Sequence, residues 1–415
     1  MDNDDKKYIP ALRFPEFLND EKWKIVNGNE LFESIVNKKH DSNLPVLAIT
    51  QENGAVPRDT INYNVIVSDK SIEGYKVVEI GDFIISLRSF QGGIEYSRYK
   101  GICSPAYIIL RKRSDNICND FYRFYFKSHQ YIQNLNSKIE GIRDGKMISF
   151  KQFSDIKIPF PHPIEQKKIA DCLSSLDKHI DATKRKLEQL KEHKKGLMQR
   201  LFPAKGKTTP ELRFPEFQND ENWNEYDLIQ LFSRITKRNT INNQNVLTIS
   251  AQHGLISQYD YFNKNVASVD VSKYYLIDKF DFAYNKSKSQ GCPYGAIKPL
   301  KLYERGVVSP LYICFRIRDK KMFYNSFFEY YFESELIHKE IDNIAKEGAR
   351  NHGLLNMSTE DFFNKIKLYV PSFEEQQRIA KCMSSIEDII KYYENKILVL
   401  EHYKRGLMQQ LFPKL

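Results

Sequence analysis

The sequence predicts an α+β fold with two tandem mixed α/β domains, separated and joined by two long helices that form a pseudo-twofold-symmetric antiparallel coiled coil. Two observations carry this prediction. First, the chain contains an internal repeat, because ten of the twelve residues at 12–23 are identical to those at 212–223. Second, each copy ends in a heptad pattern that closes on Gly-Leu-Met-Gln, followed by Leu-Phe-Pro at 201–203 and again at 411–413.

The repeat is well preserved at its ends and poorly preserved in its middle. Residues 164–203 and 374–413 share 18 of 40 positions, whereas 24–160 and 224–370 share only a skeleton of strands, a Ser-Pro pair and a helix. The offset between the copies grows from 200 at the opening motif to 210 at the helices, so the second middle is ten residues longer. Similar frames around dissimilar middles suit two domains that bind different targets. Neutral drift in a loop-rich region is the alternative explanation.

Each middle segment has the pattern of a mixed α/β domain. Runs rich in β-branched and aromatic residues predict strands, and apolar residues at helical spacing predict one helix in each copy. In the first copy the predicted strands are 46–49, 75–80, 83–87 and 106–110, and the predicted helix is 121–139. In the second copy the predicted strands are 246–249 and 311–315, and the predicted helix is 327–344. Pro159, Pro161 and Pro371 end the two domains.

The long helix after each domain has apolar positions whose steps alternate between four and three residues, which indicates a coiled coil. The first helix should begin at Pro163, and the second should begin in a capping box formed by Ser372 and Glu375. A stripe that packs only on its own domain is the alternative. The seam residues of the first helix are Ile169, Leu173, Leu176, Ile180, Leu187, Leu190 and Leu197. Those of the second helix are Ile379, Met383, Ile386, Ile390, Ile397, Leu400 and Leu407.

The connections predict how the two helices pair. Only about twenty residues separate the first helix from the second domain, so the second helix must run back toward the first domain, and the two domains lie at opposite ends. The numbers of paired seam residues then sum to about 580, so that Lys194 faces the Ile386 layer and Lys404 faces the Leu176 layer. A polar residue at a seam position fixes the register of a coiled coil at a cost in stability.

The composition indicates a polyanionic partner. The chain carries 63 Lys and Arg against 53 Asp and Glu, a formal net charge of +10, which favours nucleic acid; a merely basic soluble protein is the alternative. No apolar run approaches the length of a membrane span, and the first residues contain no apolar signal region. We therefore expect a cytoplasmic protein with no membrane partner.

Polar, glycine-containing stretches occur at equivalent positions in both copies, at 88–93 and 141–146 and again at 286–291 and 348–353. Contacts with DNA use Lys and Arg on phosphates and polar side chains on base edges, so these stretches are candidate DNA-binding loops; ordinary solvated loops are the alternative. Two such domains at a fixed distance suit a bipartite DNA site with unlike half-sites. The candidate residues are Arg88, Ser89, Gln91, Arg143, Lys146, Lys286, Lys288, Ser289, Gln290, Tyr294, Arg350 and Asn351.

Several motifs recur in the same order in both copies. The first copy contains Leu-Arg-Phe-Pro-Glu-Phe at 12–17 with Trp23, Gly-Asp-Phe-Ile at 81–84, a Ser-Pro pair, Ile-Lys-Ile-Pro at 156–159, Glu165-Gln166 and Gly-Leu-Met-Gln. This ordered set, over nearly the whole chain, resembles the specificity (S) subunit of type I restriction-modification enzymes. No single motif is diagnostic, but the ordered set occurring twice is highly specific.

The resemblance implies a DNA-binding subunit that recognises a bipartite, asymmetric site on double-stranded DNA, with one half-site for each domain. It also implies two adenine methyltransferase (M) subunits and restriction (R) subunits as partners. S-adenosylmethionine, ATP and magnesium would be bound by those partners. The implied division is an N-terminal segment with target-recognition domain 1 at 1–163, a central spacer helix at 164–203, a linker with target-recognition domain 2 at 204–372, and a C-terminal spacer helix at 373–415.

The repeated opening segments and the outer faces of the helices are candidate docking surfaces for the methyltransferase subunits, because their repetition fits two copies of one partner. The alternative is that the aromatic residues of these segments pack on their own domains. These residues are Phe14, Phe17 and Trp23 in the first copy, and Phe214, Phe217 and Trp223 in the second.

No pattern in the sequence supplies chemistry. An Asn-Pro-Pro-aromatic motif, a GxxxxGK[ST] phosphate loop, a His and Cys cluster at zinc spacing and a nucleophile with an evident partner are all absent from the sequence. We therefore predict a non-catalytic protein, with no catalytic residue, no metal site and no cofactor bound by this chain. The competing class is a stand-alone architectural or regulatory DNA-binding protein, which would work without a methyltransferase.

Overall fold

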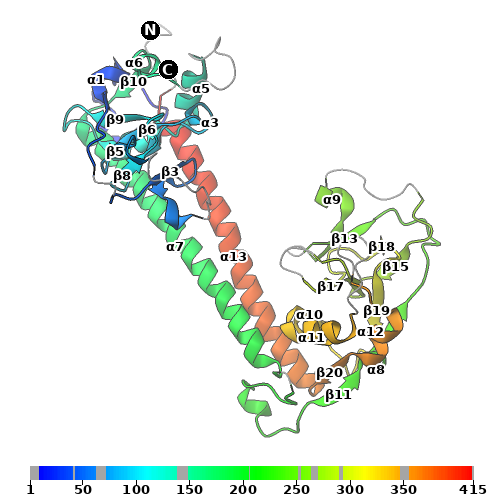
Figure 1. Ribbon diagram of the computed structural model, residues 1–415. Coiled ribbons are helices and arrows are strands. Elements are labelled where there is room, and N and C mark those ends of the chain that lie inside the picture. Colours follow the sequence, from blue (N-terminus) through cyan, green and yellow to red (C-terminus); the bar gives the residue numbers. More distant parts are fainter. Residues whose placement is uncertain are drawn as a thin grey trace. The chain divides into compact units, whose positions relative to one another are not determined.

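The computed structural model describes residues 9–40, 43–61, 72–137, 148–204, 206–250, 254–262, 270–288, 293–345 and 355–413. The chain forms two compact units. Unit 1 comprises Met1–Arg185 and Glu394–Leu415, and unit 2 comprises Lys186–Tyr393. Each unit therefore contains one half of each long helix, and the end of the chain belongs to the same unit as its beginning (Figure 1).

Unit 1 contains short helices and short strands before its long helix. Its strands are β1 (Lys24–Asn27), β2 (Phe32–Ile35), β3 (Leu47–Thr50), β4 (Gly54–Pro57), β5 (Lys76–Val78), β6 (Phe83–Ile85), β7 (Glu95–Tyr96), β8 (Gly101–Cys103), β9 (Ile108–Lys112) and β10 (Lys157–Phe160). Its helices are η1 (Pro15–Phe17), α1 (Gly28–Leu31), η2 (Arg58–Thr60), α3 (Ser89–Gly92), α4 (Asn119–Tyr125), α5 (His129–Ser137) and α6 (Phe150–Ser154), followed by α7 (Pro163–Leu201).

Unit 2 repeats this order. Its strands are β11 (Asn224–Asp227), β12 (Phe232–Ile235), β13 (Leu247–Ser250), β14 (Gly254–Ser257), β15 (Tyr275–Asp278), β16 (Phe282–Asn285), β17 (Ala296–Pro299), β18 (Arg305–Val308), β19 (Ile313–Ile317) and β20 (Lys367–Val370). Its helices are η3 (Pro215–Phe217), α8 (Leu228–Leu231), α9 (Gln258–Phe262), α10 (Asn325–Glu333), α11 (Glu335–Ile344) and α12 (Thr359–Lys365), followed by α13 (Phe373–Leu411).

The two units share one sheet topology. A four-stranded sheet has the order β2-β9-β6-β7 in unit 1 and β12-β19-β16-β17 in unit 2, with antiparallel pairing throughout. Antiparallel two-stranded sheets surround it in the same way in both units: β1-β10, β3-β4 and β5-β8 correspond to β11-β20, β13-β14 and β15-β18. The prediction of two similar mixed α/β domains is therefore confirmed.

One predicted element is wrong in each unit. The single helix expected at 121–139 is two helices, α4 and α5, and the helix expected at 327–344 is divided into α10 and α11. The break falls at Ser128 and at Ser334, where a serine begins the next helix: the hydroxyl of Ser128 accepts the backbone N–H of Tyr131 at 3.2 Å, and Ser334 has extended backbone angles. The side chain of Ser128 caps the new helix, a stabilisation that the apolar periodicity does not reveal, whereas Ser334 is the N-cap of α11 without a side-chain cap hydrogen bond.

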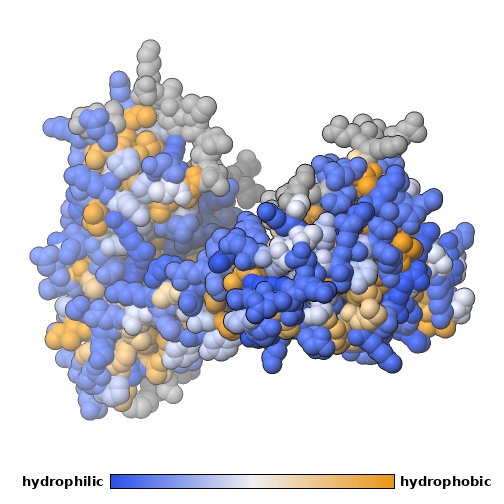
Figure 2. Space-filling view, turned by 90° about the horizontal axis from the view of Figure 1, so that it is seen from below, coloured by the Kyte–Doolittle hydropathy of each residue, from blue (hydrophilic) through white to orange (hydrophobic). Residues whose placement is uncertain are grey.

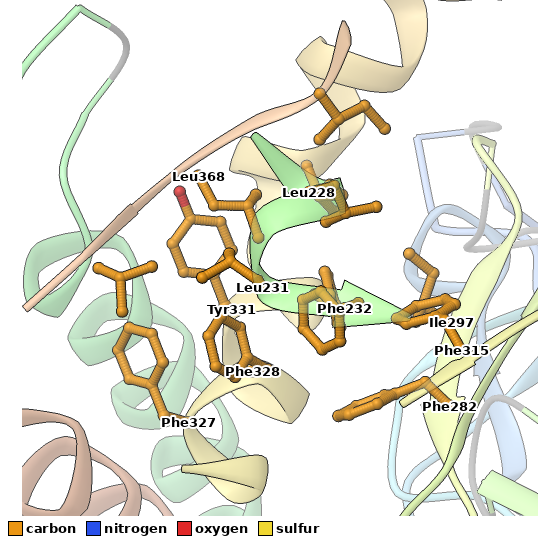
Figure 3. Packing of buried hydrophobic residues seen from close by; sticks show 14 of the residues in the cluster. Leu228, Leu231, Phe232, Phe282, Ile297, Phe315, Phe327, Phe328, Tyr331 and Leu368 are labelled. Carbon is orange, nitrogen blue, oxygen red and sulfur yellow. The ribbon is translucent and has the colours of Figure 1, made fainter. Parts of the chain in front are cut away.

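Each unit packs around a phenylalanine on the first strand of its four-stranded sheet. In unit 2 the ring of Phe232 lies 5.1 Å from that of Phe315 and 5.0 Å from that of Phe328, both edge-on (Figure 3). In unit 1 the equivalent Phe32 lies 5.3 Å from Tyr122. Edge-to-face pairs of this kind each add roughly 0.5–1.5 kcal/mol beyond the burial of their area. The aromatic content of the middle segments thus forms the two domain cores.

The ends of the long helices complete these cores. Leu411, the last residue of α13, and Phe412 after it belong to the core of unit 1, where Phe412 contacts Phe121 and Tyr125 at ring distances of 5.5 Å. Phe202, which follows α7, occupies the corresponding place in the core of unit 2. The repeated Leu-Phe-Pro motifs therefore anchor the end of α7 in the core of unit 2 and the end of α13 in the core of unit 1.

The helix halves inside each unit pair antiparallel. In unit 1, Lys404 of α13 forms an ion pair with Asp177 of α7 at 2.5 Å, and in unit 2, Lys194 of α7 pairs with Glu387 of α13 at 2.6 Å (Figure 1). In each pair the two residue numbers add up to 581, close to the predicted register. All the predicted seam residues are buried or half-buried. The coiled-coil prediction is confirmed within both units.

The predicted capping box of the second helix is only half formed. The hydroxyl of Ser372 accepts the backbone N–H of Glu375 at 3.4 Å, as expected. The carboxylate of Glu375, however, binds the guanidinium of Arg213 instead of reaching back to the cap. A charged, two-pronged partner offers a buried carboxylate stronger hydrogen bonds than one amide.

Candidate DNA-recognition surface

The first candidate segment of unit 1 connects β6 to β7 and includes the short helix α3. Arg88 and Gln91 are exposed. Ser89, in contrast, is 1% exposed, and its hydroxyl accepts the backbone N–H of Ser86 at 2.9 Å, so its burial argues against a contact with DNA. Gly93 closes the segment with a φ of 82°, and a Cβ there would lie 2.0 Å from the carbonyl oxygen of Phe126. Only glycine fits this turn.

The turn between β3 and β4 lies against this segment. Nε2 of Gln51 donates to the carbonyl of Arg88 at 3.4 Å, and a Cβ added to Gly92 would lie 2.7 Å from Cδ of Gln51. Gln51 and Asn53 are both exposed. The structure thus brings together two polar segments, of which the sequence prediction included only one. The missed signal was a second polar, glycine-containing stretch, 51–54, directly after a predicted strand.

In unit 2 the equivalent segment begins with Lys286, just after β16. Its backbone carbonyl accepts the N–H of Leu355 at 3.1 Å, and its Nζ donates to the carbonyl of Met357 at 3.4 Å. Burial lowers the pKa of the Lys286 ammonium. Lys288 is exposed. Lys286 is therefore held against the chain before α12, whereas Lys288 is available to an anionic partner.

Tyr294 has contacts within unit 2. Its ring lies 5.4 Å from the imidazole of His338 on α11, and its carbonyl accepts the hydroxyl of Tyr284 at 2.7 Å. The charge of Asp342, together with partial desolvation, raises the pKa of the Tyr294 hydroxyl. Tyr294 therefore packs against α11. The remaining candidates lie outside the described residues: Arg143, Lys146, Ser289, Gln290, Arg350 and Asn351.

The repeated opening segment is fastened to the first turn of a long helix. In unit 1 the guanidinium of Arg13 binds both carboxylate oxygens of Glu165, at 2.7 and 2.8 Å, and Trp23 donates to the same carboxylate at 2.9 Å. The hydrogen bond with Glu165 raises the pKa of Arg13. In unit 2 Arg213 binds Glu375 at 2.9 and 2.8 Å.

The tryptophans of the opening segments pack on their own domains. Trp23 is 4% and Trp223 is 3% exposed, and Phe17 is also buried. Phe14 is half-buried, with the ammonium of Lys168 5.5 Å from its ring. These aromatic residues pack on their own domains, as the alternative interpretation of the opening segments states.

The two seam lysines also connect the helix pair to each domain. Lys194 bonds to Glu387 and to Glu333 at 2.6 and 3.2 Å, and its Nζ lies 5.6 Å from the ring of Tyr330 on α10. Lys404 lies 5.3 Å from the ring of Phe124, the equivalent residue on α4. Lys194 on α7 therefore contacts both α13 and α10, and Lys404 on α13 contacts both α7 and α4.

The face in Figure 2 is mostly hydrophilic, with hydrophobic side chains in small groups. Among the described residues, no group of three or more His, Cys, Asp and Glu side chains is placed to hold a metal ion. No helix in the described part of the chain combines the length and the apolar character needed to cross a membrane.

Known proteins resemble this chain both in part and over nearly its whole length. A family model described as the type I restriction modification DNA specificity domain matches residues 20–192. The MjaVIII specificity subunit of Methanocaldococcus jannaschii is 29% identical over 206 residues, which is 47% of this chain and 44% of that relative. The putative MjaX specificity subunit of the same organism is 24% identical over 94% of this chain and 93% of its own length.

Solved structures agree on the architecture. The type I restriction-modification S subunit from M. genitalium has a TM-score of 0.51 at 15% identity, covering 98% of this chain and all of that chain. At this identity the likeness shows the fold alone. The duplicated units, the paired helices and the sequence relatives point the same way. A type I restriction modification DNA specificity domain therefore lies at residues 20–192, and the similarity of nearly the whole chain to a putative type I specificity subunit supports the resemblance seen in the sequence.

Proposed function

We propose that this chain recognises a bipartite, asymmetric site on double-stranded DNA, with one half-site bound by unit 1 and the other by unit 2. The observation that carries the proposal is the pair of exposed polar segments after β6 and β16, which are topologically equivalent strands. Their sequences differ, with Arg88 and Gln91 in one and Lys288 in the other. Equivalent positions with unlike side chains suit two readers of unlike base sequences.

We further propose that the chain is the non-catalytic scaffold for two adenine methyltransferase subunits and for restriction subunits. The repetition of surface contacts in the two units supports this proposal, because two copies of one partner need two equivalent binding surfaces. One such pair of surface contacts is Glu16–Lys168 in unit 1 and Glu216–Arg378 in unit 2. S-adenosylmethionine, ATP and magnesium would then belong to the partner subunits.

The test is adenine methylation. The chain is co-expressed with its methyltransferase partner, and methylated positions are mapped in the DNA of the cells. We expect two half-sites of unlike sequence separated by a constant number of unspecified bases. Gln91→Ala and Arg88→Ala should relax the sequence at one half-site, at about 1–3 kcal/mol of discrimination for each base contact that is lost.

Lys288→Ala is the matched change in unit 2 and should affect only the other half-site. A uniform loss of methylation without a change of sequence would identify the altered residue as a phosphate contact. Methylation at a single continuous site would contradict the bipartite proposal. If the chain bound its site with full specificity alone and did not co-purify with a methyltransferase, the stand-alone DNA-binding class would be correct instead.

A further inference from the structure

A partly buried ion pair, with a buried carboxylate, lies next to the candidate surface of unit 1. Lys127 directly follows the C-cap of α4, and its Nζ lies 2.5 Å from Oε1 of Glu95 on β7, a residue that is 2% exposed. The same Nζ donates to the carbonyl of Gly92 at 2.9 Å and to the carbonyl of Gln51 at 3.2 Å. An ammonium group has three hydrogens, so these three acceptors use its whole donor capacity.

The two carbonyls belong to the two polar segments of the surface. Gly92 ends α3, and Gln51 lies in the turn between β3 and β4. By binding both carbonyls at once, the Lys127 ammonium holds the segments side by side. The side chains of Gln51, Arg88 and Gln91 remain exposed.

Unit 2 has an acidic residue at the position of Lys127. The first residues of α4 and α10, Asn119 and Asn325, are equivalent, because each donates its side-chain amide to a carbonyl in the turn before β6 or β16. Lys127 and Glu333 each follow eight residues later. They therefore occupy the same place in the two units.

The partner is reversed as well. Glu95 lies opposite Ile84 in the β6–β7 ladder, and Lys298 lies opposite Ala283 in the equivalent β16–β17 ladder. Lys298 forms the ion pair with Glu333. In both units a salt bridge joins equivalent strands, β7 and β17, to the ends of equivalent helices, α4 and α10. The acidic residue lies on the strand in unit 1 and at the helix end in unit 2.

This comparison separates two roles. A salt bridge of either polarity joins the strand to the helix, so the fold does not require a lysine at 127. Of the two charged groups found at that position, only the ammonium can donate to backbone carbonyls, because a carboxylate has no hydrogen to give. In unit 2 the carboxylate of Glu333 instead accepts Lys194 of α7. The polarity found in unit 1 is therefore explained by the two carbonyls of the surface segments.

We propose that Lys127 is a positioning residue that sets the geometry of the DNA-contacting segments in unit 1, and thereby the sequence specificity of one half-site. The inference rests on the proposed function of unit 1 as the reader of that half-site. Lys127 acts through the backbone and does not itself touch a base. A displacement of the segments by about 1 Å is enough to lose a two-pronged base contact, whose geometry is strict.

The deciding variant is the double swap Glu95→Lys with Lys127→Glu, which copies the polarity of unit 2 and leaves the net charge unchanged. The full chain is co-expressed with its methyltransferase partner in cells that carry a plasmid library of target sites, with every single-base change in both half-sites. Discrimination at the half-site of unit 1 should fall about 10-fold or more. Discrimination at the other half-site should change less than about 2-fold, and the thermal midpoint should shift by only a few degrees.

The matched control swaps an exposed pair of the same unit, Lys112→Asp with Asp115→Lys, and should leave both half-sites unchanged. If the double swap does not fold, Glu95→Gln with Lys127→Met, which removes both the charge and the donor at 127, is judged by the same criteria. Full discrimination at the half-site of unit 1, or an equal loss at both half-sites, would overturn the inference. Failure of the proposed function looks different, because Arg88→Ala and Gln91→Ala in the otherwise wild-type chain would then alter neither half-site selectively.

Discussion

The equivalent salt bridges of the two units, Glu95–Lys127 and Glu333–Lys298, place their glutamates in different electrostatic surroundings. Burial alone would raise the pKa of Glu333, but the ammonium groups of Lys298 and Lys194 outweigh burial and hold that pKa below its usual range. Burial raises the pKa of Glu95, and its single cation, Lys127, only partly offsets this. The carboxylate with two cations is therefore the more firmly ionised of the two.

The acid dependence of stability should reflect this difference. Because the pKa of Glu333 is lower in the folded state than in the unfolded state, the unfolded state takes up the proton first as the pH falls. The stabilisation is complete above the usual glutamate pKa of about 4.3 and is lost as the pH falls through the folded pKa. Glu333→Gln should therefore lower stability at pH 7 and flatten the loss below about pH 5.

Urea unfolding midpoints measured at pH 7 and at about pH 3.5 test this expectation. Glu304→Gln is the control, because Glu304 forms an exposed pair with Lys279 and its side chain is 82% exposed. If both variants showed the same acid dependence as the wild type, Glu333 would not contribute as described.

At the same scale, residue type alone did not identify the contacts of the candidate surface. Arg88 and Gln91 of the candidate segment are exposed, but Ser89 between them is buried. The difference arises because the hydroxyl of Ser89 turns back to accept the backbone N–H of Ser86. Lys127 was missed because it lies far along the chain from Gly92, and only the folded sheet brings the two together.

At the scale of the elements, the seam lysines of the two helices are not equivalent in their surroundings. Lys194 is bonded to two carboxylates, Glu333 and Glu387. Lys404 is bonded to Asp177, which also lies 3.8 Å from the guanidinium of Arg123. Removing the first lysine takes a cation from both Glu333, which keeps Lys298, and Glu387, whereas removing the second leaves Asp177 with Arg123.

We therefore expect Lys194→Met to destabilise the protein by about 2 kcal/mol or more, since it uncovers charge in a partly buried place. Lys404→Met should cost about 1 kcal/mol or less, because Met packs well at a seam position and Arg123 still neutralises Asp177. Denaturant unfolding of the two variants under identical conditions measures the difference. Equal costs would mean that the seam position, and not its ion pairs, determines the effect.

At the scale of the whole molecule, each unit is assembled from two separate stretches of chain. Unit 1 contains residues from both ends of the sequence, and its core includes Leu411 and Phe412 as well as Trp23 and Phe121. The first domain is therefore incomplete until the last residues of the chain have joined it. The equivalent residues Leu201 and Phe202 complete the core of unit 2, and they precede its domain in the sequence.

Phe412→Ala should consequently destabilise unit 1 by about 3–5 kcal/mol, although it lies in the last few residues of the chain. Hydrogen exchange should show lost protection in the sheet β2-β9-β6-β7, with the sheet of unit 2 unchanged. Phe202→Ala is the matched variant and should weaken the sheet β12-β19-β16-β17 instead. Lost protection confined to the end of α13 would contradict this account.

By itself, the sequence determined the duplication, the class of fold, the seam of the helices and their antiparallel register. These follow from local periodicity and from identity between the copies, which are properties of the chain before it folds. The tertiary structure decided which polar residues of a loop face solvent, that Gln51 lies beside α3, and that Lys127 binds two surface segments at once. Such contacts join residues far apart in sequence, so they depend on how strands and helices pack and leave no local pattern.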